Sequence, residues 1–186
     1  MNGFVVRGIR ADEWRLAKAL RLEALKDSAA DIAFLETYED AVARPDSFWQ
    51  ERALGAGEAA GGVRQFVAEA AGGEWVGSVT VLVEEAGSVD WAGLPVERRQ
   101  GHVVGVYVRP EWRGGEVTPG LFEAGVEWAW EVGLERVRLL VHPENLRAQG
   151  AYRKVGFVPS GVSVPVGEGF GDFSGEVEIE FVRERG

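Results

Sequence analysis

A turn between a strand pattern and a helical pattern is the first place in the sequence where chemistry is expected. Val106 and Val108 alternate with their neighbours as in a β-strand, and Pro110 ends that pattern. Two glycines then free the backbone before the apolar periodicity that begins at Val117. Such a turn directs successive backbone N–H groups, and the positive end of a helix, toward one point. A phosphate group suits that point.

A second stretch combines polar and aromatic residues at regular spacing. From Asn145 to Phe157 the sequence is NLRAQGAYRKVGF, in which Asn145 is suited to cap a short helix and Gly156 to end it. Four residues of this helix share one face: Ala148, Ala151, Tyr152 and Val155.

Both stretches resemble signatures of the GNAT family of N-acetyltransferases. The first is similar to the acyl-CoA-binding motif, in which Arg or Gln is followed by two variable positions, Gly, one variable position, and Gly or Ala. Arg113, Val117 and Leu121 match, whereas Glu116 and Thr118 stand where the family has small residues. The second stretch matches the pattern NxxAxxxYxxxGF at every fixed position. Two signatures in this order, with a strand between them, imply the GNAT fold over nearly the whole chain.

The resemblance implies transfer of an acetyl group from acetyl-CoA, as co-substrate, to a primary amine of a small molecule or peptide. In the family, the strand corresponding to residues 104–108 splays away from its neighbour, and its free backbone groups hold the acyl carbonyl and the pantetheine arm. The N–H of Val106 would face the carbonyl, Val108 would bond to the pantetheine, and the amides of residues 113–118 would hold the pyrophosphate. The implied binding residues are Val106, Tyr107, Val108, Arg113, Gly114, Gly115, Glu116, Val117, Thr118, Asn145 and Tyr152.

Two residues are implied in proton transfer. Tyr152 occupies the position from which family members protonate the departing thiolate, and a phenol with a pKa near 10 stays protonated at neutral pH. His102 stands where many members have a Glu that takes the proton of the amine, and an ordinary pKa near 6.5 suits that task. Glu84 and Glu85 compete with His102 for this role. The simpler alternatives are a Tyr152 that only packs and a His102 that faces solvent or a backbone partner.

Glu116 is the main departure from the family pattern. A carboxylate about 5 Å from a phosphate, at an effective dielectric constant of ~20, would cost about 3 kcal/mol of binding free energy. A side chain that points into water would lose most of that effect through screening. Two other functions therefore stay open: a GNAT-fold binding or regulatory protein without transferase activity, and a transferase with an acyl donor other than CoA, such as an aminoacyl-tRNA. The acidic composition weighs against the latter.

The elements that must position these residues follow from hydrophobic periodicity. Strands are predicted at 4–10, 64–71, 75–85, 136–142, 157–166 and 176–183, and a further strand is predicted to end at Val108. Helices are predicted from Asp12 to about Lys26, from Pro45 through Ala53, from Val117 to near Gly133, and after Asn145. Residues 86–99 are expected to be irregular, and 167–175 to form a glycine-rich turn. In the last strand we expect Val177, Ile179 and Phe181 to point inward and Glu178 and Glu180 outward.

The predicted fold class is α/β: a GNAT fold with a twisted mixed sheet of about six to seven strands and helices on both faces. One domain over residues 1–186 is expected. The acceptor is expected to enter between the N-terminal helices and the late strands. The aromatic residues available there are Phe34, Tyr38, Trp49, Trp91 and Phe170, and each of them is more typical of a packed core than of a substrate wall.

Composition narrows the classes of function. Cysteine is absent and the two histidines lie far apart, so no metal site is expected. The net charge of −10 disfavours nucleic-acid binding and would attract a cationic amine. No long apolar run is present, and Met1 to Arg10 lack a signal-peptide pattern, so we expect no membrane span and a cytoplasmic location. A homodimer is left open.

Overall fold

The computed structural model describes residues 3–186 and contains one seven-stranded sheet in the order β1-β2-β3-β4-β5-β7-β6. The strands are β1 (Phe4–Gly8), β2 (Val63–Ala70), β3 (Trp75–Glu84), β4 (Gln100–Val108), β5 (Arg136–Val141), β6 (Val158–Pro165) and β7 (Val177–Glu184). β4 and β5 run parallel, and the other neighbouring strands run antiparallel. The prediction of a mixed α/β sheet of six to seven strands is confirmed.

The helical segments lie between these strands along the chain. They are η1 (Ala11–Glu13), α1 (Trp14–Ala24), α2 (Ala30–Ala33), α3 (Tyr38–Val42), α4 (Asp46–Gly55), η2 (Pro110–Trp112), α5 (Val117–Glu131), α6 (Leu146–Lys154) and η3 (Glu168–Phe173). The predicted turn at 167–175 therefore contains a short 3-10 segment. No helix between residues 3 and 186 is long and apolar enough to cross a membrane.

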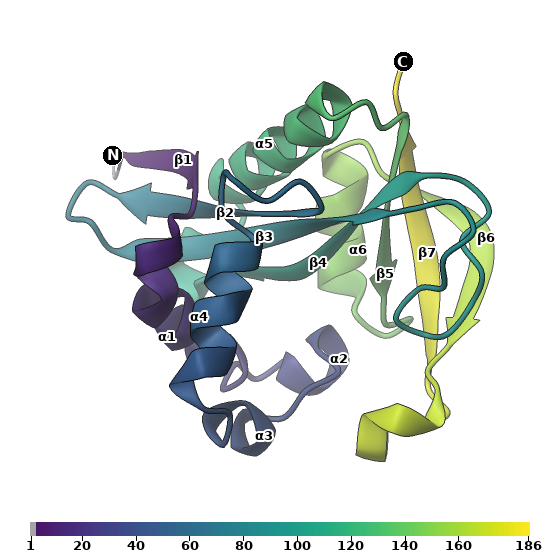
Figure 1. Ribbon diagram of the computed structural model, residues 1–186, viewed down its shortest axis with the longest axis horizontal. Helices are drawn as coiled ribbons and strands as arrows, with labels where there is room; N and C mark the ends of the chain where they lie inside the picture. The colour runs from purple at the N-terminus through teal and green to yellow at the C-terminus, as the bar shows by residue number, and fades with distance from the viewer. Residues whose placement is uncertain (1–2) are drawn as a thin grey trace.

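Helices cover both faces of the sheet. Phe66 and Ala68 of β2 pack in one core with α5 and α6, whereas the intervening Val67 packs in a second core with α1 and α4. Figure 1 shows α5 on one side of β2 and β3 and α1 and α4 on the other. Gly125 allows the close approach of α5, because a Cβ there would lie 3.0 Å from a methyl carbon of Val81. Each large apolar side chain buried in these cores contributes about 1.5–3 kcal/mol.

The parallel strands β4 and β5 separate partway along their length. Their pairing ends at Val103 and Leu139, although β4 continues to Val108. Just beyond, the register of β4 against β3 shifts, and Gly105 adopts a φ of +62°. This is a β-bulge, which bends β4 away and increases its local twist. The bulge and the lost pairing open the sheet at this point.

Two expectations for the last strand are wrong: Val177 was expected to point inward but is 43% exposed, and the two glutamates expected to point outward are covered. Glu178 and Glu180 are buried, with 7% and 6% of their surface exposed. Glu180 pairs with Arg138 of β5 (3.2 Å) and Arg136 (2.9 Å). The inward orientation of Ile179 and Phe181 is confirmed, because both pack with α5 and α6. The face opposite to them is therefore covered as well.

Candidate active site

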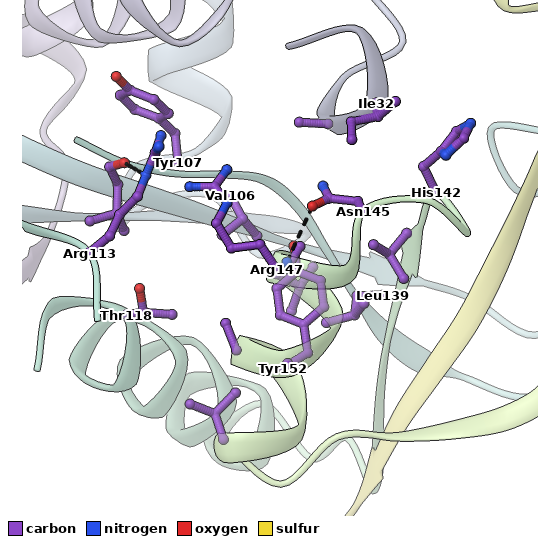
Figure 2. Close-up of a pocket in the computed structure, with 18 of the residues that line it drawn as sticks. Ile32, Val106, Tyr107, Arg113, Thr118, Leu139, His142, Asn145, Arg147 and Tyr152 are labelled. Carbon is purple, nitrogen blue, oxygen red and sulfur yellow. Dashed lines mark hydrogen bonds between the residues drawn. The ribbon is translucent and has the colours of Figure 1, made fainter. Parts of the chain in front are cut away.

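A cavity of about 590 Å³ lies where β4 and β5 separate. Its wall comes from β4, the turn before α5, the end of β5, α6, and the segment around α2. Of the predicted binding residues, it includes Val106, Tyr107, Val108, Arg113, Gly114, Gly115, Thr118, Asn145 and Tyr152. Figure 2 shows several of these side chains gathered around the opening. Glu116, Val117 and His102 are not part of the wall.

The turn before α5 presents unused backbone donors. Within residues 3–186 no hydrogen-bond acceptor is found for the main-chain amides of residues 114–118, and the first N–H of α5 with a partner is that of Gly120, on the carbonyl of Glu116 (2.9 Å). Gly114 has a φ of +75°, and a Cβ added at Gly115 would meet nothing within 4 Å. These amides sit at the positive end of a 15-residue helix. The arrangement can bind an anion such as a phosphate.

The side chain of Glu116 is not part of the cavity wall. It is exposed and does not cap α5. Solvent therefore screens its charge, so the repulsion from a phosphate falls well below the value for an unscreened pair. Thr118, the other departure from the family pattern, lines the cavity and is only half-buried. Its hydroxyl is a donor that a small residue would not provide.

Arg113 links the turn to the end of β4 and to the segment after α1. Its Nε donates to the carbonyl of Val108 (2.8 Å), and its Nη2 donates to Asp27 (2.6 Å) in the segment after α1. Burial would raise the pKa of Asp27, but hydrogen bonds from the Ala29 amide and from Arg113 outweigh it and lower that pKa. The guanidinium therefore positions the turn, and the carbonyl of Val108 already has a donor.

Asn145, which caps α6, and Tyr152, which lies on α6, both line the cavity and are labelled in Figure 2. Asn145 Oδ1 accepts from the amide of Ala148 (3.2 Å), so the predicted helix cap is confirmed. The ring of Tyr152 packs against Phe122, with centroids 5.5 Å apart. Burial and the nearby charge of Glu178 raise the pKa of Tyr152, and Arg147 offsets this in part. The phenol is thus held in its protonated form at neutral pH.

None of the three side chains predicted as candidate bases lines the cavity. His102 is 2% exposed, with Nδ1 3.2 Å from Glu84. Burial opposes the charge of Glu84, yet hydrogen bonds from His102 and Arg138 lower its pKa to about 2. Glu85 pairs with Arg99 at the surface. A carboxylate with so low a pKa is a weak base, and the base role of His102 stays a prediction.

Sequence reasoning missed Glu178. It lines the cavity from β7, and its Oε2 is buried without a hydrogen-bond partner. Burial, and next the charge of Glu176, raise the pKa of Glu178 to about 7. His142 also lines the cavity, and its Nδ1 accepts from the amide of Glu144 (3.1 Å). The strict alternation in β7 could have placed Glu178 opposite Ile179, but nothing local signalled that this face is covered.

The predicted aromatic wall is only partly present. Phe34 lines the cavity, whereas Trp49 is buried in the core formed by α1 and α4. Trp91 stacks edge-on against Phe170 with centroids 5.1 Å apart, and neither of them lines the cavity. This contact favours the interpretation of Trp91 as a loop anchor.

The sequence matches the model of the acetyltransferase (GNAT) family over residues 22–157. The chain belongs to the GNAT acetyltransferase family. A protein of Bacillus subtilis (strain 168) named putative ribosomal protein bS18-alanine N-acetyltransferase is 31% identical over 70 residues. The match covers 38% of this chain and 46% of that protein, so this GNAT chain aligns with about half the length of the curated relative.

Solved structures share the whole GNAT fold with this chain. The PaiA N-acetyltransferase of Thermoplasma acidophilum, in complex with coenzyme A, superposes with a TM-score of 0.71 at 14% identity, covering 98% of this chain and 99% of that one. A phosphinothricin acetyltransferase of Sinorhizobium meliloti, in complex with acetyl-CoA, gives 0.71 at 15% identity, covering 98% and 89%. At these identities the likeness establishes the fold alone.

Proposed function

We propose that this GNAT protein is an N-acetyltransferase that moves an acetyl group from acetyl-CoA to a primary amine of a small molecule or peptide. The observation that carries the proposal is the set of unpartnered amides at residues 114–118, at the edge of the cavity. A diphosphate needs several donors converging at the positive end of a helix, and this turn offers them. Two structural relatives were solved with CoA or acetyl-CoA, which supports the proposal.

The residues divide into those that would hold CoA and those that keep the site in shape. The amides of residues 114–118 and the hydroxyl of Thr118 would bind the diphosphate. The main chain around Val106, exposed where β4 leaves β5, would face the pantetheine arm and the acyl carbonyl. Arg147 and Lys154 line the same cavity and would add positive charge near the phosphates. Arg113 would act by fixing the turn, since its Nε and Nη2 already bond to Val108 and Asp27.

Tyr152 is proposed as the acid of the reaction. When bound, acetyl-CoA supplies a thioester whose sulfur leaves as a thiolate. A proton donor must stand at the cavity wall and keep its proton until then. Tyr152 is half-buried and lines this wall. Its raised pKa keeps it protonated at neutral pH.

Calorimetry with CoA and acetyl-CoA tests the donor part of the proposal. We expect binding in the micromolar range, about −8 kcal/mol, weakened at least about tenfold in Arg113→Ala because the turn loses both anchors. Arg15→Ala, an exposed arginine on α1, is the matched control and should bind as the wild type does. Circular dichroism confirms that each variant is folded. No heat and no thermal shift at millimolar CoA would exclude a CoA-dependent transferase.

Turnover tests the acid and the acceptor. Release of free CoA thiol is measured with a panel of small primary amines and a peptide that starts with alanine, because a relative is named for alanine acetylation. Tyr152→Phe should lower kcat at least about 10²-fold and leave CoA affinity unchanged. Unchanged turnover would remove Tyr152 from the mechanism. CoA binding without turnover of any amine would instead indicate a GNAT-fold binding protein.

A further inference from the structure

We propose that the carboxylate of Glu178 takes the proton from the incoming ammonium group of the acceptor, so that a neutral amine attacks the thioester. The inference rests on the proposed transferase function and assigns its base to a residue of β7. Glu178 is more than nine-tenths buried, lines the cavity, and has an oxygen without any hydrogen-bond partner among the described residues. Burying an unpaired carboxylate oxygen costs folding free energy, unless a bound ligand supplies the missing hydrogen bond.

The other acidic groups and the histidine of the cavity wall already have partners or keep their proton. Asp27 is paired with Arg113 (2.6 Å) and has a lowered pKa. His142 uses its Nδ1 lone pair for the amide of Glu144, and its Nε2 lies 3.8 Å from Glu176. Tyr152 keeps its proton. Glu178 is the remaining cavity carboxylate in residues 3–186.

The surroundings of Glu178 keep its protonation close to balance near neutral pH. Burial disfavours the ionised form of Glu178, and the negative charge of Glu176, two residues earlier, adds to this effect. Together they raise the pKa of Glu178 to about 7. From α6, Tyr152 and Arg147 face the same space, and the charge of Glu178 in turn raises the pKa of Tyr152. His142 borders it from the end of β5. A base poised near the working pH transfers protons efficiently.

The step balances without any further reactant. The ammonium gives one proton to the carboxylate of Glu178, which becomes a neutral carboxylic acid, and the free amine forms a C–N bond to the acyl carbon. The C–S bond breaks, and the thiolate takes the proton of Tyr152. The second proton on nitrogen returns to the Tyr152 phenolate, and Glu178 releases its proton to water. The products are an amide, CoA thiol and one proton.

The wall also indicates the class of acceptor. Besides Glu178, the side of the cavity formed by the α2 segment and β5 is apolar and includes Ile32, Phe34 and Leu140. Figure 2 places Ile32 across the opening from Tyr152. One unpaired carboxylate and an apolar wall suit a single ammonium on an apolar carrier. A polyamine would leave its further charges against apolar surface.

The test measures kcat against pH for wild type, Glu178→Gln and two controls, using the best amine of the panel. In the wild type kcat should fall about tenfold per pH unit below a midpoint near 7. Glu178→Gln should lower kcat at neutral pH at least about 10²-fold, abolish that midpoint, and leave CoA affinity within about twofold. Glu176→Gln should stay active with its midpoint at lower pH, since one negative neighbour is removed.

Contrary outcomes separate the two levels of the proposal. A wild-type midpoint that persists in Glu178→Gln and disappears in His102→Gln would overturn the assignment to Glu178 and leave the transferase function intact. Loss of CoA binding in Glu178→Gln would also overturn it, because the residue would then be structural. A wild-type protein that neither binds CoA nor acetylates an amine would refute the proposed transferase function itself.

Discussion

Replacing Glu178 by Gln should make the stability of the protein less dependent on pH. The folded state raises the pKa of this carboxyl from its ordinary 4.5 to about 7, mainly by burial. At about 1.4 kcal/mol per pH unit, this corresponds to about 3 kcal/mol of unfolding free energy. The sign follows from the raised pKa: the contribution is fully present below about pH 4.5 and is lost as the pH rises through about 7. Gln has nearly the same shape and no charge, so it avoids this loss.

Urea unfolding at several values between pH ~4.5 and ~8.5 measures the effect. The free energy of unfolding of Glu178→Gln, minus that of the wild type, should grow by about 3 kcal/mol across this range. Glu127→Gln, an exposed carboxylate on α5, is the matched control and should show a difference near zero at every pH. A difference for Glu178→Gln that stays constant within ~0.5 kcal/mol would refute the buried, unpartnered carboxylate on which the base assignment depends.

Three further substitutions test the framework of the site. Gly105→Ala places a side chain at a φ of +62° in the β4 bulge. It should lower the free energy of unfolding in urea by about 1–2 kcal/mol and weaken CoA binding. Unchanged stability and binding would show that the bulge does not require glycine. Arg138→Met leaves Glu84, Asp90 and Glu180 without their shared buried partner. It should lower the free energy of unfolding by about 3–5 kcal/mol, whereas a loss below ~1 kcal/mol would mean that these carboxylates find other partners. Glu116→Gln should change CoA affinity less than about threefold by calorimetry because the side chain is exposed; a tenfold gain would place the carboxylate over the phosphates.

The sequence allowed much of the fold to be predicted because the evidence for it is local. Period-two alternation in the strands, Pro45 before α4, Asn145 before α6 and the glycines before α5 mark most elements to within a few residues. The two signature stretches also placed the cavity, since both of them line it. The short helices α2 and α3 were not predicted, because apolar and acidic residues mix there and the sequence shows no clear helical periodicity.

The parts that could not be predicted depend on contacts between distant segments. The pairing of Arg113 with Asp27, 86 positions away, could not be seen in either signature stretch. The strand carrying His102 was predicted, whereas its burial against Glu84 depends on β3. Glu178 looked outward because a charged residue in an alternating strand usually faces water. Which face is covered is decided by packing between elements, and a strand pattern does not contain that information.

Amide NMR spectra of isotope-labelled protein, recorded during a titration with CoA, test the central claim most directly. If the free N–H groups of residues 114–118 hold the diphosphate, their resonances should move first and furthest and reach saturation together with the calorimetric binding curve. The amides of residues 130–133, at the opposite end of the 15-residue helix α5, should stay in place. Binding of CoA with the resonances of Gly114, Gly115 and Thr118 unchanged would contradict the account.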